Sequence, residues 1–349
     1  MTFWVYINVA WQRWSPSNSL PNSKRPRPTP KPTQRMAHPD ELETLTKAFS
    51  GHGIHEQALI SILGKWQPEE KKSFRKGNPN LFIEDERNFE RWDDQHVRLL
   101  KHEFMRFKNA VVLWTMHPWE RDARLVKEAL KKGPQSYGIL IEISCTRSAD
   151  ELLGTRRAYH SLFDHSIEED VAYHVNVSER KLFVALVSAY RYEGSKVKED
   201  IAKSEAMTLS NAIKEADNRK PIEDDEVIRI LSTRSKPHLQ AIYKHYNEIS
   251  GKNIDEELDI DLRLKETVQC LCIPQKYFSK VLDTALTKDT DKNIKKALTR
   301  VIVTRADTDM REIKQEYNNQ FGVPLSKKIE DTTNGNYKDF LLTLIARGG

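Results

Sequence analysis

The stretch Leu140–Leu152, which reads LIEISCTRSADEL, returns twice further along the chain. Val227–Leu239 reads VIRILSTRSKPHL and Val301–Met310 reads VIVTRADTDM. Each copy has an apolar run, then Thr-Arg, then a polar stretch. Such recurrence indicates one supersecondary unit that was copied, with neighbouring copies sharing a buried core.

A tyrosine follows the arginine of each copy by 12 residues. The pairs are Arg147 and Tyr159, Arg234 and Tyr246, and Arg305 and Tyr317. The arginines lie 87 and 71 residues apart, so the unit is longer than the common solenoid repeats. A weaker first copy, ALISILGK at Ala58–Lys65, has Trp66 in the place of the arginine. The sequence therefore predicts four units.

The composition excludes several classes of protein. Charged residues make up 31% of the 349 residues and the mean hydropathy is −0.67, which predicts a soluble protein. No stretch approaches the roughly 18–20 consecutive apolar residues that span a bilayer. Three cysteines without CxxC spacing favour a reducing compartment and argue against a disulfide framework or a zinc site. We find no P-loop, HExxH pattern or Ser/His/Asp arrangement with supporting context.

The formal net charge of +5 comes from the first 35 residues, which hold six basic side chains and no acidic one. Without them the chain carries −1, so the charge does not predict nucleic-acid binding. PRPTPKPTQR within this segment predicts an extended, solvated chain. A disordered extension over residues 1–36, or a start at Met36, is the interpretation we favour. An organellar transit peptide is the alternative.

From residue 38 onward the apolar spacing is helical. Leu42, Leu45 and Phe49 lie on one face of a predicted helix, and a second helix is predicted from about Glu56. The β-branched run Val301–Thr304 sits within helical periodicity, so we interpret it as buried helix. The expected fold is all-α, with about five short helices per unit and no sizeable sheet.

These phrases resemble the annexin family. GHGIHEQALISIL is similar to that family's GxGTDExxLIxIL, and GNYKDFLLTLIARGG resembles its C-terminal ending. CTRSADELLGTRRAYHSLF, with Cys145 and Cys270, looks like the plant branch. The resemblance implies four repeats of five helices in one curved disc, after the disordered extension of residues 1–36. The repeats would span residues 37–117, 118–190, 191–273 and 274–349.

The resemblance also implies Ca²⁺ sites, each with backbone carbonyls from the loop between the first two helices of a repeat and a carboxylate from further along. In the first repeat the carbonyls would be those of Phe49, Gly51 and Gly53, with Glu103 as the carboxylate. Glycine-rich turns and oxygen ligands suit this hard cation. Glu103 lies fifty residues after Gly53, so an insertion within RKGNPNLFIEDERN is required. The alternative is that GHG only ends one helix and starts the next.

The other three loops depart from the family pattern. The second, KKGPQSYG, lacks the turn and has His174 where the carboxylate belongs. The third, RKPIEDDE, has Pro221 and Ile222 in the loop, and its acidic residues suit a helix start. The fourth keeps Asp289 and Asp291, with Thr332 in the carboxylate position. We expect one good calcium site, a second at Asp289 and Asp291, and two losses.

The resemblance implies a non-enzymatic protein that binds anionic phospholipid membranes when calcium is present. It would be cytoplasmic, reversibly membrane-associated and active in calcium or stress signalling. Actin and other annexins are further candidate partners. Ile228-Arg229-Ile230 matches a three-residue actin-binding pattern, but it lies on the expected buried face of a helix, so we favour a core role for it. The alternatives are a calcium-independent interaction scaffold and a redox or peroxidase-like protein. Lys65 stands where plant members carry the histidine linked to peroxidase activity, which counts against the last.

Two further pairs are expected from the same resemblance. Asp122 with Arg147, and Asp283 with Arg305, would lie in a hydrophilic centre between the repeats. They would either line an ion path or fix helix packing as buried pairs, and we favour the second. The cysteines are expected to be buried apolar residues rather than redox groups.

Overall fold

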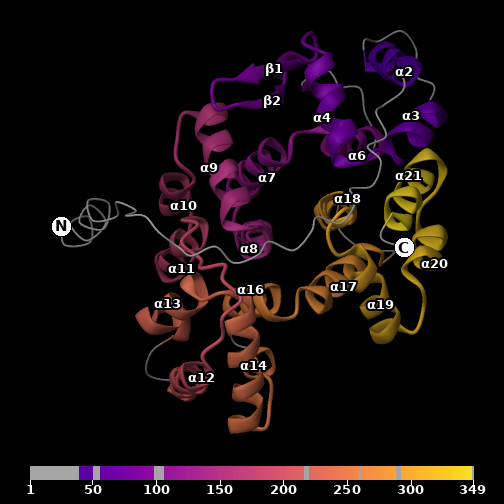
Figure 1. Ribbon diagram of the computed structural model, residues 1–349. Helices are drawn as coiled ribbons and strands as arrows, with labels where there is room; N and C mark the ends of the chain where they lie inside the picture. The colour runs from indigo at the N-terminus through magenta and orange to yellow at the C-terminus, as the bar shows by residue number, and fades with distance from the viewer. Residues whose placement is uncertain are drawn as a thin grey trace, which may run out of the picture. The chain divides into compact units, whose positions relative to one another are not determined.

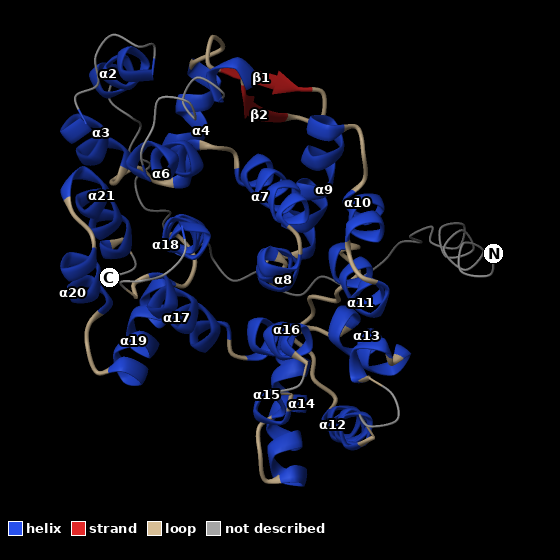
Figure 2. Ribbon diagram, turned by 180° about the vertical axis from the view of Figure 1, so that it is seen from behind, coloured by secondary structure: helices blue, strands red, loops and turns tan. Residues whose placement is uncertain are grey.

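The computed structural model describes residues 39–49, 56–97, 106–215, 220–258, 261–287 and 292–347. The predicted extension, residues 1–36, therefore lies outside the described residues. The described part is helical apart from one hairpin, which confirms the predicted fold class (Figures 1 and 2). The β-branched run Val301–Thr304 lies inside helix α18, as its periodicity predicts.

The elements follow one another along the chain in four similar groups. The first comprises α2 (Pro39–Phe49), α3 (Glu56–Leu63), α4 (Pro68–Gly77), β1 (Phe82–Asp85), β2 (Phe89–Trp92) and α6 (Arg106–Thr115). The second comprises α7 (Pro118–Lys132), the 3₁₀ turn η1 (Pro134–Ser136), α8 (Gly138–Thr146), α9 (Ala149–Phe163), α10 (Ile167–His174) and α11 (Val177–Val187). The third comprises α12 (Glu199–Lys214), η2 (Pro221–Glu223), α13 (Asp225–Thr233), α14 (Lys236–Ser250), α15 (Ile254–Glu257) and α16 (Leu262–Cys272). The fourth comprises α17 (Pro274–Ala285), α18 (Lys292–Arg305), α19 (Met310–Phe321), α20 (Leu325–Thr332) and α21 (Gly335–Ala346).

The recurring phrase is the junction between the second and third helices of a group. Its apolar run is the buried part of α8, α13 and α18, and its arginine stands at the end of that helix. The following Ser148 and Ser235 cap the next helices by accepting hydrogen bonds from the backbone N–H groups of Glu151 and His238. The motif recurs because each unit makes the same helix end and helix start.

The recurring tyrosines anchor the third helix of the second, third and fourth groups. Tyr159, Tyr246 and Tyr317 are fully buried, and each hydroxyl donates a hydrogen bond to a carboxylate. The acceptors are Asp170 on α10, Glu257 on α15 and Asp283 on α17, respectively. A buried phenol needs a hydrogen-bond partner, so the tyrosine fixes how its helix packs.

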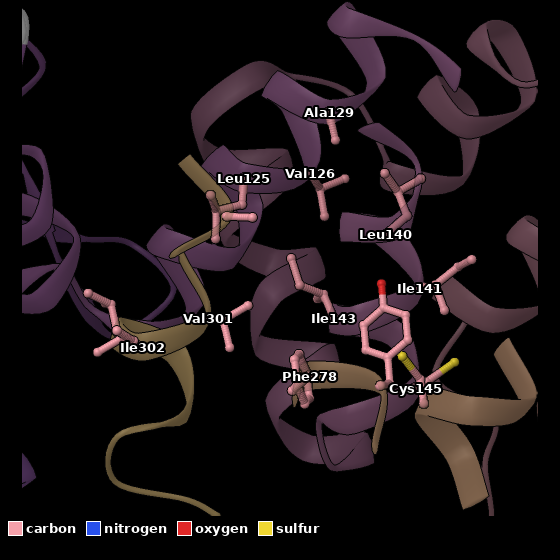
Figure 3. Packing of buried hydrophobic residues seen from close by; sticks show 14 of the residues in the cluster. Leu125, Val126, Ala129, Leu140, Ile141, Ile143, Cys145, Phe278, Val301 and Ile302 are labelled. Carbon is pink, nitrogen blue, oxygen red and sulfur yellow. The ribbon is translucent and has the colours of Figure 1, made fainter. Parts of the chain in front are cut away.

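Apolar side chains of several groups meet in one core. Figure 3 shows Ile143 of α8 near Val126 of α7, with Phe278 of α17 and Val301 of α18 close by. All four side chains are almost fully buried. The core therefore joins the second and fourth groups, as a shared core between copied units predicts.

The helix pair α7 and α9 packs closely because one residue lacks a side chain. A Cβ atom on Gly154 would lie 2.0 Å from the Trp119 indole. Any other residue would push the indole or the helix away.

The first group departs from the all-helical expectation. Strands β1 and β2 pair antiparallel, with Phe82 opposite Trp92, and the two rings lie 4.4 Å apart between centroids (Figure 2). The turn contains Asn88 at φ 62°, a left-handed conformation that asparagine tolerates. Glu120 on α7 accepts a hydrogen bond of 3.0 Å from the backbone N–H of Trp92. Strand β1 and the turn lie within the stretch predicted to hold an insertion, β2 follows directly after it, and the hairpin docks on the second group.

Candidate calcium and membrane site

The residues predicted for the first calcium site fall in connections between helices. Phe49 is the last residue of α2, while Gly51, Gly53 and Glu103 lie outside the described residues. The first site therefore stays a prediction. Its donor set fits calcium chemically, since it offers only carbonyl and carboxylate oxygens.

The predicted ligands of the fourth loop, Asp289 and Asp291, also lie outside the described residues. At the corresponding carboxylate position, the Thr332 hydroxyl donates a hydrogen bond of 2.7 Å to the Lys328 carbonyl. Its neighbour Asp331 forms an ion pair of 3.1 Å with Lys327. Both side chains thus make contacts within their own helix.

The second loop is fully described, and its residues do not fit a calcium ion. Gly133 adopts φ 86°, and Pro134–Ser136 form the turn η1. The guanidinium of Arg263, on α16, donates a hydrogen bond to the Pro134 carbonyl. The Tyr137 hydroxyl donates one of 2.7 Å to the carbonyl of His174, the residue in the carboxylate position. A fixed positive charge thus occupies a carbonyl that the ion would need.

Three carboxylates surround Arg263, and burial raises the pKa of each. They are Glu179, Asp261 and Glu266. Glu266 accepts a hydrogen bond of 2.6 Å from Arg263, whereas Oε2 of Glu179 is buried with no hydrogen-bond partner among the described residues. The described residues contain no group of three or more His, Cys, Asp or Glu side chains placed to hold a metal ion. This seam between α11 and α16 is an arginine-centred cluster.

The acidic run of the third loop starts a helix. Asp224 accepts hydrogen bonds of 2.9 and 3.1 Å from the backbone N–H groups of Glu226 and Val227. Asp225 pairs with Lys181 at 3.1 Å. This arrangement confirms the helix-start interpretation, since negative charge stabilises the first turn of a helix.

Two ion pairs were expected in a hydrophilic centre. The structure contains the pair of Asp122 with Arg147, and the predicted pair of Asp283 with Arg305 is wrong. Arg147 donates hydrogen bonds of 2.5 and 3.0 Å to Asp122, and the two side chains are only 9% and 2% exposed. Arg305 instead binds Asp309, at 2.7 and 2.6 Å. Asp283 instead accepts a hydrogen bond from the Tyr317 hydroxyl. Asp309 begins the helix that follows Arg305, so the nearer carboxylate is available within one turn.

The cysteines are buried, and so is most of the proposed actin pattern. Burial raises the pKa of the Cys145 thiol and raises that of Cys272 to about 12. Ile228 and Ile230 are core residues, and Arg229 binds Glu226 and Glu205. The expectation of buried side chains is confirmed for the cysteines and for Ile228 and Ile230, whereas Arg229 is partly exposed.

Several contacts have no signal in the sequence. The Lys71 ammonium lies 2.8 Å from Asp307 and 3.4 Å from the centre of the Trp114 ring. Arg263 and Pro134 are 129 residues apart. No local period in the sequence marks partners at such separations, so these contacts could not be predicted.

Among the described helices, none is long and apolar enough to cross a membrane.

Comparison with known proteins agrees with this geometry. The family model described as Annexin matches residues 121–186, 205–263 and 277–344. Annexin D4 of Arabidopsis thaliana is 57% identical over 318 residues, which cover 89% of this chain and 99% of the relative. Annexin Gh1 of Gossypium hirsutum is 40% identical over 321 residues, with 90% and 96% covered.

Solved structures show the same architecture. Annexin III superposes with a TM-score of 0.74 at 26% identity, over 90% of this chain and 96% of that one. Chicken annexin V in complex with Zn²⁺ gives a TM-score of 0.71 at 26% identity, over 88% and 94%. The repeated helix junctions, the buried tyrosines and these matches together show that the chain belongs to the annexin family, in its plant branch.

Proposed function

We propose that this annexin binds Ca²⁺ through its first loop and thereby docks on membranes that contain anionic phospholipids. Phe49, Gly51 and Gly53 would supply carbonyl oxygens and Glu103 a carboxylate, with Asp289 and Asp291 contributing a second site. A surface ion with few protein ligands leaves positions open for lipid phosphate oxygens. The observation that carries the proposal is the 57% identity to Annexin D4 over most of the chain.

The protein would act in the cytoplasm as a reversible peripheral membrane protein in calcium or stress signalling, with no catalytic residue. Residues 37–117, 118–190, 191–273 and 274–349 would be its four repeats. Contacts with actin or other annexins stay a prediction. An actin contact through Ile228 and Ile230 would require both side chains to leave the core.

Vesicle pelleting tests the proposal. The wild type should pellet with phosphatidylserine vesicles in millimolar calcium and stay in solution in chelator. It should not pellet with phosphatidylcholine vesicles under either condition. Glu103→Gln should raise the calcium needed for half-maximal binding by at least about tenfold, because one charged ligand is lost. Glu69→Gln, which changes an exposed acid on α4, is the matched control and should match wild type.

The competing function is a scaffold that has lost calcium regulation. The capture of the Pro134 carbonyl by Arg263 favours it, since that loop cannot accept the ion. Equal pelleting in calcium and in chelator, unchanged by Glu103→Gln, would support the scaffold and overturn the calcium proposal. Calorimetric titration of Asp289→Asn/Asp291→Asn should show one calcium fewer than wild type if the second site exists.

A further inference from the structure

A cavity of about 700 Å³ lies between the first and fourth groups of helices. Its walls come from the connection between α3 and α4, the connection between α18 and α19, and the end of α21. Helices α3 and α21 lie side by side in Figures 1 and 2. This volume is in the range of small-molecule sites and is larger than an inorganic ion needs.

Fixed positive charge lies at one wall of the cavity. Asp307 accepts hydrogen bonds of 2.8 Å from both Lys71 and Arg347. Arg347 also donates one of 2.7 Å to the Gly64 carbonyl. One carboxylate therefore serves two cations, and burial lowers the pKa of Lys71 to about 8.

A third buried cation, Arg121, lies behind this wall. Arg121 is only 8% exposed, and its closest carboxylate oxygen, on Asp122, is 3.6 Å away. Asp122 already binds Arg147 through two hydrogen bonds, and Nε of Arg121 has no hydrogen-bond partner among the described residues. Asp307 and Arg121 interact electrostatically, so these groups form one cluster. Four cations share two carboxylates there: Lys71, Arg121, Arg147 and Arg347 against Asp122 and Asp307.

Two further cations line the cavity and are available to a ligand. Lys65 and Arg311 are exposed, and neither side chain forms a hydrogen bond or ion pair with a described residue. Glu312 is the only other acidic residue among the lining residues that the structure describes. The remaining wall is mixed: Pro68, Ala306, Met310 and Ala346 supply apolar groups, and Gln67, Thr308 and Thr343 supply polar ones. The cavity thus offers positive charge beside a wall that carries both apolar and polar groups.

We propose that this cavity binds a phosphate monoester attached to a small organic group. Lys65 and Arg311 bind the phosphate oxygens, and the guanidinium fork suits an oxyanion. The buried excess of positive charge favours a dianion, and the apolar side chains of the mixed wall contact the organic group. The phosphate monoester is carried either by a free metabolite or by a lipid headgroup. This site is separate from the calcium loops and does not depend on them.

Calorimetry in chelator, with phenyl phosphate as the probe, tests the site. The wild type should bind one phenyl phosphate, and phenol and inorganic phosphate should bind at least about tenfold more weakly. Lys65→Gln/Arg311→Gln should weaken phenyl phosphate binding by at least about tenfold. Lys280→Gln/Arg157→Gln, which removes the same charges from exposed positions outside the cavity, should match wild type. Circular dichroism checks that both variants are folded.

A vesicle arm separates the two sources of the phosphate. If the wild type pellets with phosphatidic acid vesicles in chelator and Lys65→Gln/Arg311→Gln does not, the phosphate belongs to a lipid headgroup. Phenyl phosphate binding without such pelleting assigns a free metabolite. The proposal is overturned if phenyl phosphate does not bind, if inorganic phosphate binds equally well, or if the double variant binds like wild type. None of these outcomes depends on calcium.

Discussion

The guanidinium of Arg300 donates two hydrogen bonds of 2.8 Å to the carboxylate of Glu142, although 158 residues separate them. The pair joins α18 to α8 and is almost fully buried. The Tyr277 hydroxyl, 3.3 Å away, also donates to Glu142. A buried ion pair is an expensive contact to break, because either partner alone is left as an unpaired charge.

Arg300→Met should lower the free energy of unfolding by about 3–5 kcal/mol, because Glu142 stays buried without its partner. The double variant Arg300→Met/Glu142→Met should recover most of this loss. Urea denaturation followed by circular dichroism measures both. Lys327→Met, which breaks an exposed ion pair with Asp331, is the control and should cost less than about 1 kcal/mol. A loss as small as that of the control would contradict the role of the Arg300 pair.

Lys71 should make stability depend on pH. Burial lowers its folded-state pKa from 10.5 to about 8, so between these values the unfolded chain binds more protons than the folded one. Stability therefore rises as pH increases through this window. From pH 7.5 to 9.5, wild type should gain about 2 kcal/mol relative to Lys71→Met. Parallel urea titrations at the two pH values measure the gain, and an unchanged difference between the proteins would refute it.

The recurring tyrosines should contribute similar stability in the three units that carry them. Tyr159→Phe, Tyr246→Phe and Tyr317→Phe each remove a hydroxyl that donates to a carboxylate. Each change should cost about 1–3 kcal/mol of unfolding free energy, the range for hydrogen bonds to charged groups. Tyr173→Phe is the control, since Tyr173 is 82% exposed. Thermal unfolding should leave the control unshifted; three unshifted buried variants would show that these hydrogen bonds do not stabilise the fold.

The three cysteines should be unreactive in the native protein. Cys145, Cys270 and Cys272 are buried, and burial raises the pKa of each thiol. At pH 8 a disulfide reagent should react with none of them quickly, and with all three after denaturation in urea. The absorbance of the released thiolate measures the count. A thiol that reacts rapidly in the native state would reopen the redox interpretation.

Much of the fold could be predicted because its determinants are local. The Thr-Arg-Ser phrase specifies a helix end and a helix cap within a few residues, so it reads the same in α8–α9 and α13–α14. The pairing of Asp122 with Arg147 could be predicted through the family resemblance. The same reasoning was wrong for Asp283, because Asp309 lies one turn from Arg305 and accepts the hydrogen bonds of its guanidinium instead. The hairpin at Phe82–Trp92 was missed, since a short strand pair within a helical pattern leaves only a weak period.

For the candidate calcium site, too, some features could be predicted from the sequence and others required the tertiary structure. The oxygen donors of the first loop follow from glycines and acids visible in the chain, and they stay a prediction. The loss of a calcium-compatible second loop has a cause that only the packing reveals, since Arg263 reaches Pro134 from another repeat.

The order of residues by itself determined the number of units, the start and end of their helices, and which face of each helix is apolar. These features depend on contacts within one or two turns, which the spacing of side chains encodes directly. Only the tertiary structure decided which charges meet. Arg300 binds Glu142, Arg263 binds the Pro134 carbonyl, and Lys71 shares Asp307 with Arg347. These contacts form because the packing of the copied helices brings together residues that are far apart in the sequence. The burial that results sets the strength of those contacts.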